Sequence, residues 1–216
     1  MTRKVKKSAA HRPTRSRTPQ DAVALLKADH RLVAQLFRRF ESASGQTKRQ
    51  LAERICTELT VHTILEEELF YPACRRARVE SDRLDEAQVE HDSLKVMIAG
   101  IEGQSPQQPF YDAKVKVLCE YVTHHVREEE RPGGLFTQAR RASIDLKALG
   151  EQLKSRKQFL TQGGARPPAP KIRSLGIAEL PQGAGQIRVV RIRETERTRR
   201  AAAGSDEREP GVHPGT

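Results

Sequence analysis

Histidine and glutamate stand four residues apart at two places in this chain, as His62 with Glu66 and as His125 with Glu129. Side chains at this spacing lie one turn from each other on the same face of a helix, so each pair can present an imidazole and a carboxylate to one ion. An unpaired carboxylate costs several kcal/mol when it faces an apolar core. A pair of cations, bridged by the two glutamates, would remove this cost. The spacing therefore predicts a metal centre.

A lone histidine precedes each of these pairs. Taken singly, such a histidine is more often a hydrogen-bonded core residue than a metal ligand, and each pair alone could be a solvated ion pair. The joint pattern favours a metal centre, because the same order of residues occurs twice as an internal repeat. We predict that the ligands are His30, His62, Glu66, His91, His125 and Glu129. Nitrogen and oxygen ligands without thiolate suit iron or manganese, with zinc as the chief competitor.

One pair leaves a choice between neighbouring residues, since His124 also has a glutamate, Glu128, four residues after it. The apolar stripe that passes through Val122 favours His125 with Glu129 as the residues that face the core. A second stripe on the same helix would favour His124 instead.

Four predicted helices carry these residues, and they are identified by apolar side chains at every third or fourth position. The expected helices span about 19–42, 45–72, 81–103 and 109–131. Short connections favour antiparallel neighbours, so we predict an all-α, up-down-up-down four-helix bundle. A short fifth helix is expected over about 146–160.

Local signals predict how two of these helices begin and end. Thr18 is expected to cap the first helix, with Pro19 in its first turn and Asp21 in the capping-box position. Pro72 is expected to disturb the end of the second helix.

Charge divides the chain into three parts. Residues 1–20 hold seven Lys or Arg and no acid, residues 21–162 hold 22 residues of each sign, and residues 163–216 hold ten basic and six acidic residues. We therefore predict a basic disordered arm at 1–18, a helical bundle domain at 19–162 and a largely disordered tail, rich in Pro, Gly and Arg, at 163–216. Basic extensions can contact nucleic acid, although a solvated segment is their commoner explanation.

The sequence argues against several functional classes. No run approaches the roughly 18 apolar residues of a membrane span. Three cysteines without CxxC spacing favour neither a disulfide framework nor a cysteine zinc site, so a cytoplasmic location is expected. No nucleophile elbow or phosphate-binding loop accompanies the carboxylates, which argues against a hydrolase or a kinase.

The motifs resemble those of the hemerythrin-like family, often called HHE cation-binding domains. They are "ADH" at 28–30, "HTILEEELFYP" at 62–72, "VEH" at 89–91 and "HHVREEE" at 124–130. The resemblance implies a non-heme di-iron centre in a four-helix bundle, with the six candidates above on the ligand positions. It also favours His125 over His124. Oxygen-carrying members have a further histidine where this chain has Lys95, so the resemblance argues against reversible oxygen carriage.

The function expected from these features is a di-iron centre that binds or reacts with dioxygen, peroxide or nitric oxide, in sensing, scavenging or iron handling. Oxidase-like or peroxidase-like activity is compatible with such a centre. A second hypothesis is a redox-responsive binding module that the basic tails attach to nucleic acid.

Overall fold

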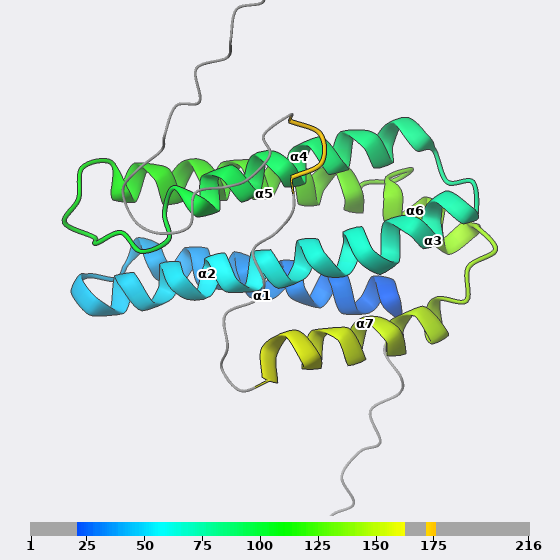
Figure 1. The fold of residues 1–216 in the computed structure, drawn as a ribbon, viewed down its shortest axis with the longest axis horizontal. Helices are drawn as coiled ribbons and strands as arrows, with labels where there is room; N and C mark the ends of the chain where they lie inside the picture. The colour runs from blue at the N-terminus through cyan, green and yellow to red at the C-terminus, as the bar shows by residue number, and fades with distance from the viewer. Residues whose placement is uncertain (1–20, 163–171, 176–216) are drawn as a thin grey trace, which may run out of the picture. The chain divides into compact units, whose positions relative to one another are not determined.

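The computed structural model describes residues 21–162 and 172–175, and the regular secondary structure among them is helical (Figure 1). Four long helices, α1, α2, α4 and α5, form the predicted all-α, up-down-up-down bundle, which is confirmed. Their bounds are Ala22–Glu41, Gly45–Leu65, Ser81–Ala99 and Tyr111–Glu130. None of the helices in the described part of the chain has the length and apolar composition of a membrane span. The predicted arm at 1–18 and most of the predicted tail lie outside the described residues.

The first helix begins later than the sequence predicts, at Ala22, and its cap is Asp21 rather than Thr18. The backbone of Asp21 is extended, and its Oδ1 accepts a hydrogen bond from the N–H of Ala24 at 2.8 Å. A carboxylate satisfies a free N–H at the start of a helix and is stabilised by the helix dipole there, which is why Asp21 can act as the cap itself. Thr18 lies outside the described residues.

The second helix continues past Pro72 instead of ending there, because a wide π-helical turn precedes the proline. This turn is η1, and the helix that follows it is α3; their bounds are Glu66–Phe70 and Tyr71–Arg76. The N–H of Tyr71 donates to the carbonyl of Glu66, five residues back. Proline has no N–H and its ring crowds the preceding turn, so the wider turn accommodates it. Glu66, Glu67 and Tyr71 are all buried in this arrangement.

Two apolar layers form the core of the bundle and leave a polar layer between them. On α1 the first apolar layer includes Leu26 and the second begins with Val33, with His30 between the two. The same order occurs on α4, where His91 separates residues of the first layer from residues of the second. The packing of the helices thus brings the polar residues of these apolar faces together in one layer, between the two apolar layers.

Two further helices, α6 (Leu135–Arg141) and α7 (Leu146–Thr161), follow the bundle. The second is the predicted fifth helix, and it packs against α1, α2 and η1 (Figure 1, yellow). Helix α6 was not predicted from the sequence. A Cβ at Gly134, just before α6, would overlap the backbone carbonyls of the last turn of α5, so glycine lets the chain turn back closely at this point.

Replacing Leu153 by alanine is expected to lower the free energy of unfolding by about 2–5 kcal/mol. Leu153 on α7 is fully buried in the first apolar layer, so the substitution leaves a cavity. Phe159→Ala on the same helix is the matched control, because that side chain is 67% exposed and its loss should cost no more than about 0.5 kcal/mol. Urea denaturation measures both variants, and equal effects would contradict the packing of α7 against the bundle.

Candidate metal centre

The six predicted ligand side chains meet in the polar layer between the two apolar layers. They are all buried, with exposed fractions from 0% for Glu66 to 7% for His30. Donor atoms of four of them lie within 4.8 Å of one another: His30, His62, Glu66 and Glu129. Glu66 also belongs to a second group with the same spacing, which contains His91 and His125. The donors are therefore arranged as two adjoining groups that share a carboxylate.

The four imidazoles form two pairs within this layer. The Nε2 atoms of His30 on α1 and His62 on α2 are 3.0 Å apart. Those of His91 on α4 and His125 on α5 are 3.2 Å apart. Each helical hairpin of the sequence repeat thus supplies one pair, and the inner nitrogens of all four rings point toward the centre.

Each glutamate lies between the two imidazole pairs. Oε2 of Glu66 is 3.2 Å from Nε2 of His62 and 3.3 Å from Nε2 of His91. Oε2 of Glu129 is 3.5 Å from Nε2 of His30 and 3.6 Å from Nε2 of His125. Each carboxylate is therefore close to one imidazole of each pair, as a bridging ligand would be.

Of the neighbouring histidines on α5, His125 is the one that faces the centre. Its side chain is 3% exposed, whereas the side chain of His124 is 59% exposed. Nε2 of His124 lies 3.5 Å from Glu90 instead. The orientation follows the apolar stripe that includes Val122, which is buried on the same face.

Four carboxylates that the sequence analysis did not identify face the outer nitrogens of the imidazoles. The Nδ1 contacts are His30 with Glu130 at 2.8 Å, His91 with Glu67 at 3.1 Å, His125 with Glu90 at 2.6 Å and His62 with Asp29 at 3.8 Å. The last distance is too long for a hydrogen bond. A carboxylate at this position orients a metal-binding imidazole and raises its basicity. A sequence signal existed, because each of the four acids is adjacent in the chain to a predicted ligand.

Tyr71 is a further buried residue of the centre that the sequence analysis did not assign. Its hydroxyl oxygen lies 3.1 Å from Oε1 of Glu129, 3.3 Å from Oε2 of Glu66 and 3.2 Å from Nε2 of His91. Burial, together with the charges of the two glutamates, raises the pKa of Tyr71 well above its ordinary value. The hydroxyl therefore keeps its proton and is a hydrogen-bond donor inside the centre.

Lys95 is buried, with 1% exposure, and its ammonium contacts carboxylates beside the centre. Nζ is 2.6 Å from Oε1 of Glu67 and 2.7 Å from Oδ1 of Asp92. Burial opposes the ionisation of Asp92, but hydrogen bonds from Lys95 and from residues 173 and 174 outweigh it and lower the pKa of Asp92 to about 2. The pKa of Glu67 is also lowered, because hydrogen bonds from His91 and Lys95 outweigh its burial.

Comparison with known proteins agrees with this geometry. Residues 21–132, about half of the chain, match the hemerythrin HHE cation-binding domain. The chain belongs to this family. A protein named DNA nickase from Nostoc sp. is 31% identical over 107 residues, which are 49% of this chain and 30% of that relative. This chain therefore spans under a third of the relative's length.

A solved HHE cation-binding domain protein from Mycobacterium kansasii has a similar fold. The two chains superpose with a TM-score of 0.54 at 23% identity, over 64% of this chain and 86% of the other. At this identity the likeness supports the bundle architecture of the HHE domain and carries no further functional conclusion.

The donor set of the HHE domain fits a pair of cations. Oε1 of Glu66 and Oε2 of Glu129 are buried without a hydrogen-bond partner among the described residues. Burial and repulsion from Glu66 raise the pKa of Glu129 to about 8. Burial opposes the protonation of His62, but the charges of Glu66 and Asp29 outweigh it and raise the pKa of His62 to about 10. Cations would supply the missing partners of these carboxylates and replace the protons.

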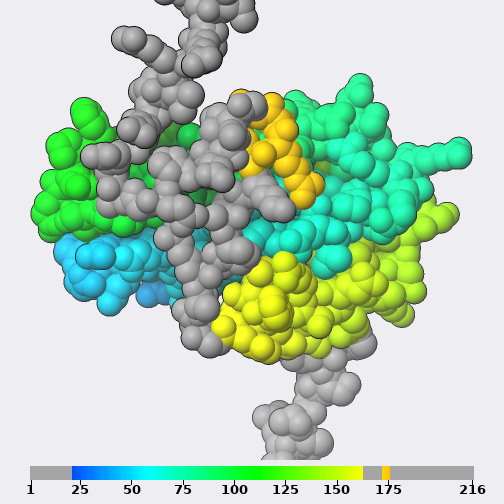
Figure 2. All heavy atoms as spheres, viewed as in Figure 1, coloured from blue at the N-terminus to red at the C-terminus, as the bar shows by residue number. Residues whose placement is uncertain are grey.

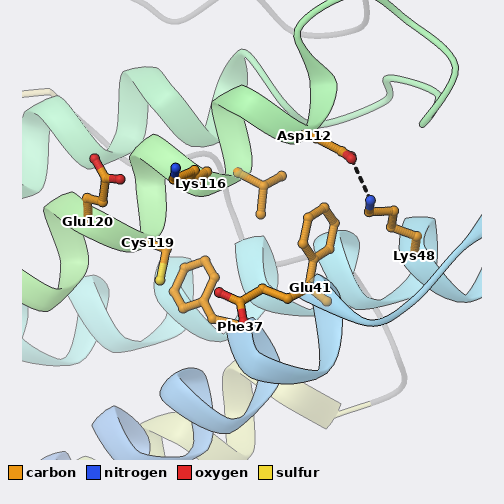
Figure 3. A pocket seen from close by; sticks show the side chains of 9 residues that line it. Phe37, Glu41, Lys48, Asp112, Lys116, Cys119 and Glu120 are labelled. Carbon is orange, nitrogen blue, oxygen red and sulfur yellow. Dashed lines mark hydrogen bonds and ion pairs between the residues drawn. The ribbon is translucent and has the colours of Figure 1, made fainter.

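A groove between α1 and α5 lies on the surface of the HHE domain and extends as far as His30. Two cavities of about 300 Å³ and 320 Å³ share Phe37 and Cys119 in their walls, and His30 lines the first of them. Figure 3 shows the second, which is bordered by the ion pair of Lys48 with Asp112. A smaller cavity lies at the centre itself, between the four imidazoles and apolar side chains of all four long helices. The walls of the two larger cavities combine apolar side chains with charged ones, and Glu41 is common to the two.

Metal binding is expected to release protons near pH 7, at least those on His62 and Glu129. His62 and Glu129 both hold a proton at this pH in the metal-free protein, because their pKa values are about 10 and about 8. The affinity for Zn²⁺ should therefore increase as the pH rises from about 6 to about 8. Calorimetric titrations in buffers with different heats of ionisation count the protons. An affinity that does not change with pH would contradict the assignment of these two side chains as ligands.

Proposed function

We propose that this protein holds two non-heme iron ions and that its centre binds or reacts with dioxygen, peroxide or nitric oxide. The observation that carries the proposal is the position of Glu66 and Glu129, each close to one imidazole of each pair. Carboxylates placed in this way suit two cations that share ligands. Sensing, scavenging and iron handling are the roles that such a centre would serve.

The proposed ligands divide between two ions. His30 and His62 would bind one ion and His91 and His125 the other, with the two glutamates shared. Iron held there would supply the change of oxidation state that allows small oxidants or nitric oxide to be bound or reduced. Imidazole and carboxylate ligands without thiolate suit iron or manganese, and zinc is the metal that a test must exclude.

The residues around the centre favour reaction or sensing over reversible carriage. Lys95 directs its ammonium to Glu67 and Asp92, so this position adds no seventh ligand and coordination positions stay open. Tyr71 places a proton donor 3.1 Å from Glu129.

The cytoplasm is the compartment that we propose for this function. Cys56, Cys74 and Cys119 form no disulfide bond with one another, and a reducing environment keeps cysteines in this state.

A nucleic-acid-binding module is the alternative function. The relative from Nostoc sp. carries the name DNA nickase, and residues 1–20 of this chain hold seven basic residues and no acid. In this alternative the basic segments would contact phosphate groups, and the oxidation state of the HHE centre would regulate the contact.

His125→Ala is expected to lose most of the bound iron, whereas His124→Ala, the matched control, should retain it. The aerobically purified natural protein should contain about two irons per chain, with little zinc or manganese. Ligand-to-iron charge-transfer absorption should accompany the iron and should disappear in His125→Ala and Glu66→Ala. Equal iron in the two histidine variants would contradict the ligand assignment, and zinc-loaded protein would contradict the choice of metal.

For the alternative, binding of a fluorescent DNA duplex should weaken steeply as salt is added. Replacing the basic residues of segment 1–20 by glutamine should then reduce the slope of log K against log salt by about 0.9 for each phosphate that the variant no longer neutralises. Fluorescence anisotropy of the iron-loaded protein, before and after reduction, measures both effects. A slope that is the same in the natural protein and the glutamine variant would exclude the basic arm as the binding segment.

A further inference from the structure

A short segment beyond the bundle, residues 172–175, lies against α4 (Figures 1 and 2, orange). Oδ2 of Asp92 accepts hydrogen bonds from the N–H groups of Arg173 at 2.7 Å and Ser174 at 2.6 Å. It also accepts one from the hydroxyl of Ser174 at 2.8 Å. Asp92 is fully buried, so these donors satisfy a carboxylate oxygen that is shielded from water.

The other oxygen of Asp92 begins a chain of contacts that ends at a proposed metal ligand. Oδ1 of Asp92 accepts from Nζ of Lys95 at 2.7 Å, and the same ammonium donates to Oε1 of Glu67 at 2.6 Å. Oε1 of Glu67 in turn lies 3.1 Å from Nδ1 of His91. Continuous polar contacts therefore connect the segment near residue 174 with the outer nitrogen of one imidazole.

Charge also couples the segment to this chain of contacts. The guanidinium of Arg173 approaches Oε2 of Glu67 at 3.7 Å, on the carboxylate that faces His91. With the segment in place, two cations, Lys95 and Arg173, lie beside the two anions Asp92 and Glu67. Without the segment, Glu67 would lose the nearby positive charge of Arg173, and Asp92 would lose three hydrogen-bond donors.

We propose that residues 172–175 form a clasp which, through Asp92, Lys95 and Glu67, positions the His91 ring for metal binding. An imidazole whose outer nitrogen is held by an oriented carboxylate keeps its inner nitrogen directed at the metal. Docking of the clasp and binding of metal therefore strengthen each other, and by linkage they do so by the same factor. The coupling rests on the proposed function, whereas the docking of the clasp on Asp92 does not.

Ser174→Asp in the full-length protein tests the clasp. The new carboxylate faces the carboxylate of Asp92, so the clasp should be released, and hydrogen exchange of the amides of Arg173 and Ser174, which donate to Asp92, should become fast. The dissociation constant for Zn²⁺, measured by competition with a chelator, should increase about fivefold or more. Ser44→Asp is the matched control, because it adds the same charge at the exposed N-cap of α2, where an acidic residue is tolerated, and should change neither quantity.

A second variant tests whether the clasp positions the His91 ring or only stabilises the fold. Ser174→Ala keeps the two backbone donors to Asp92 and removes only the hydroxyl, so its effect on Zn²⁺ affinity should be smaller than that of Ser174→Asp. In the natural protein, Zn²⁺ should slow exchange at residues 173 and 174 by about the factor that Ser174→Asp costs in affinity. The imidazole NMR signals of His91 should shift in Ser174→Asp and stay unchanged in Ser44→Asp.

The possible results distinguish the clasp from the proposed function. Fast exchange in Ser174→Asp with unchanged Zn²⁺ affinity would overturn the coupling, and unchanged exchange would overturn the clasp itself. Natural protein that binds no metal would overturn the proposed function and the coupling together, while exchange in the metal-free protein would still decide whether the clasp docks on Asp92.

Discussion

Two carboxylates, Glu66 and Glu129, lie where the bundle excludes water, and the rest of the centre is arranged around them. Burial of like charges this close costs several kcal/mol unless cations or protons compensate. Each nearby group reduces that cost: four imidazoles face the two glutamates, and a tyrosine hydroxyl donates to them. The two apolar layers above and below keep the dielectric low and make this compensation necessary.

The two halves of the internal repeat supply equivalent side chains to this polar layer. Each helical hairpin contributes both rings of one imidazole pair, but its glutamate also approaches a ring of the other hairpin. Two of the four outer carboxylates cross in the same way, since Glu67 of the first hairpin contacts His91 and Glu130 of the second contacts His30. The other two, Asp29 and Glu90, face an imidazole of their own hairpin. Neither hairpin holds a complete set of donors, so the centre depends on the packing of the two halves.

The π-helical turn among the described helices lies at the centre. The π-helical turn at 66–70 and the proline after it bury Glu66, Glu67 and Tyr71, three polar side chains of one short segment. Such turns are frequent at functional sites, because they redirect side chains that a regular α-helix would place elsewhere. Lys95, on α4, is another buried polar side chain beside the centre. Its ammonium is stable there only because the carboxylates of Glu67 and Asp92 contact it.

The sequence by itself determined the four long helices, their antiparallel order, helix α7 and the six inward-facing candidate donors, because helix periodicity fixes which residues share a face. It carried no signal for α6. It favoured His125 over His124, since a shift of one residue turns a side chain by about 100° around the helix, and the structure decided between them. It misplaced the start of α1, because the choice of cap depends on local hydrogen bonds. It indicated that Pro72 disturbs the second helix but not that the disturbance is a π-helical turn followed by a further helical turn. Only the tertiary structure decided which glutamate lies between which rings, that Tyr71 reaches both glutamates, and that residues 172–175 meet Asp92. These are contacts between segments distant in the chain, and they are set by packing, for which the spacing of residues carries no signal.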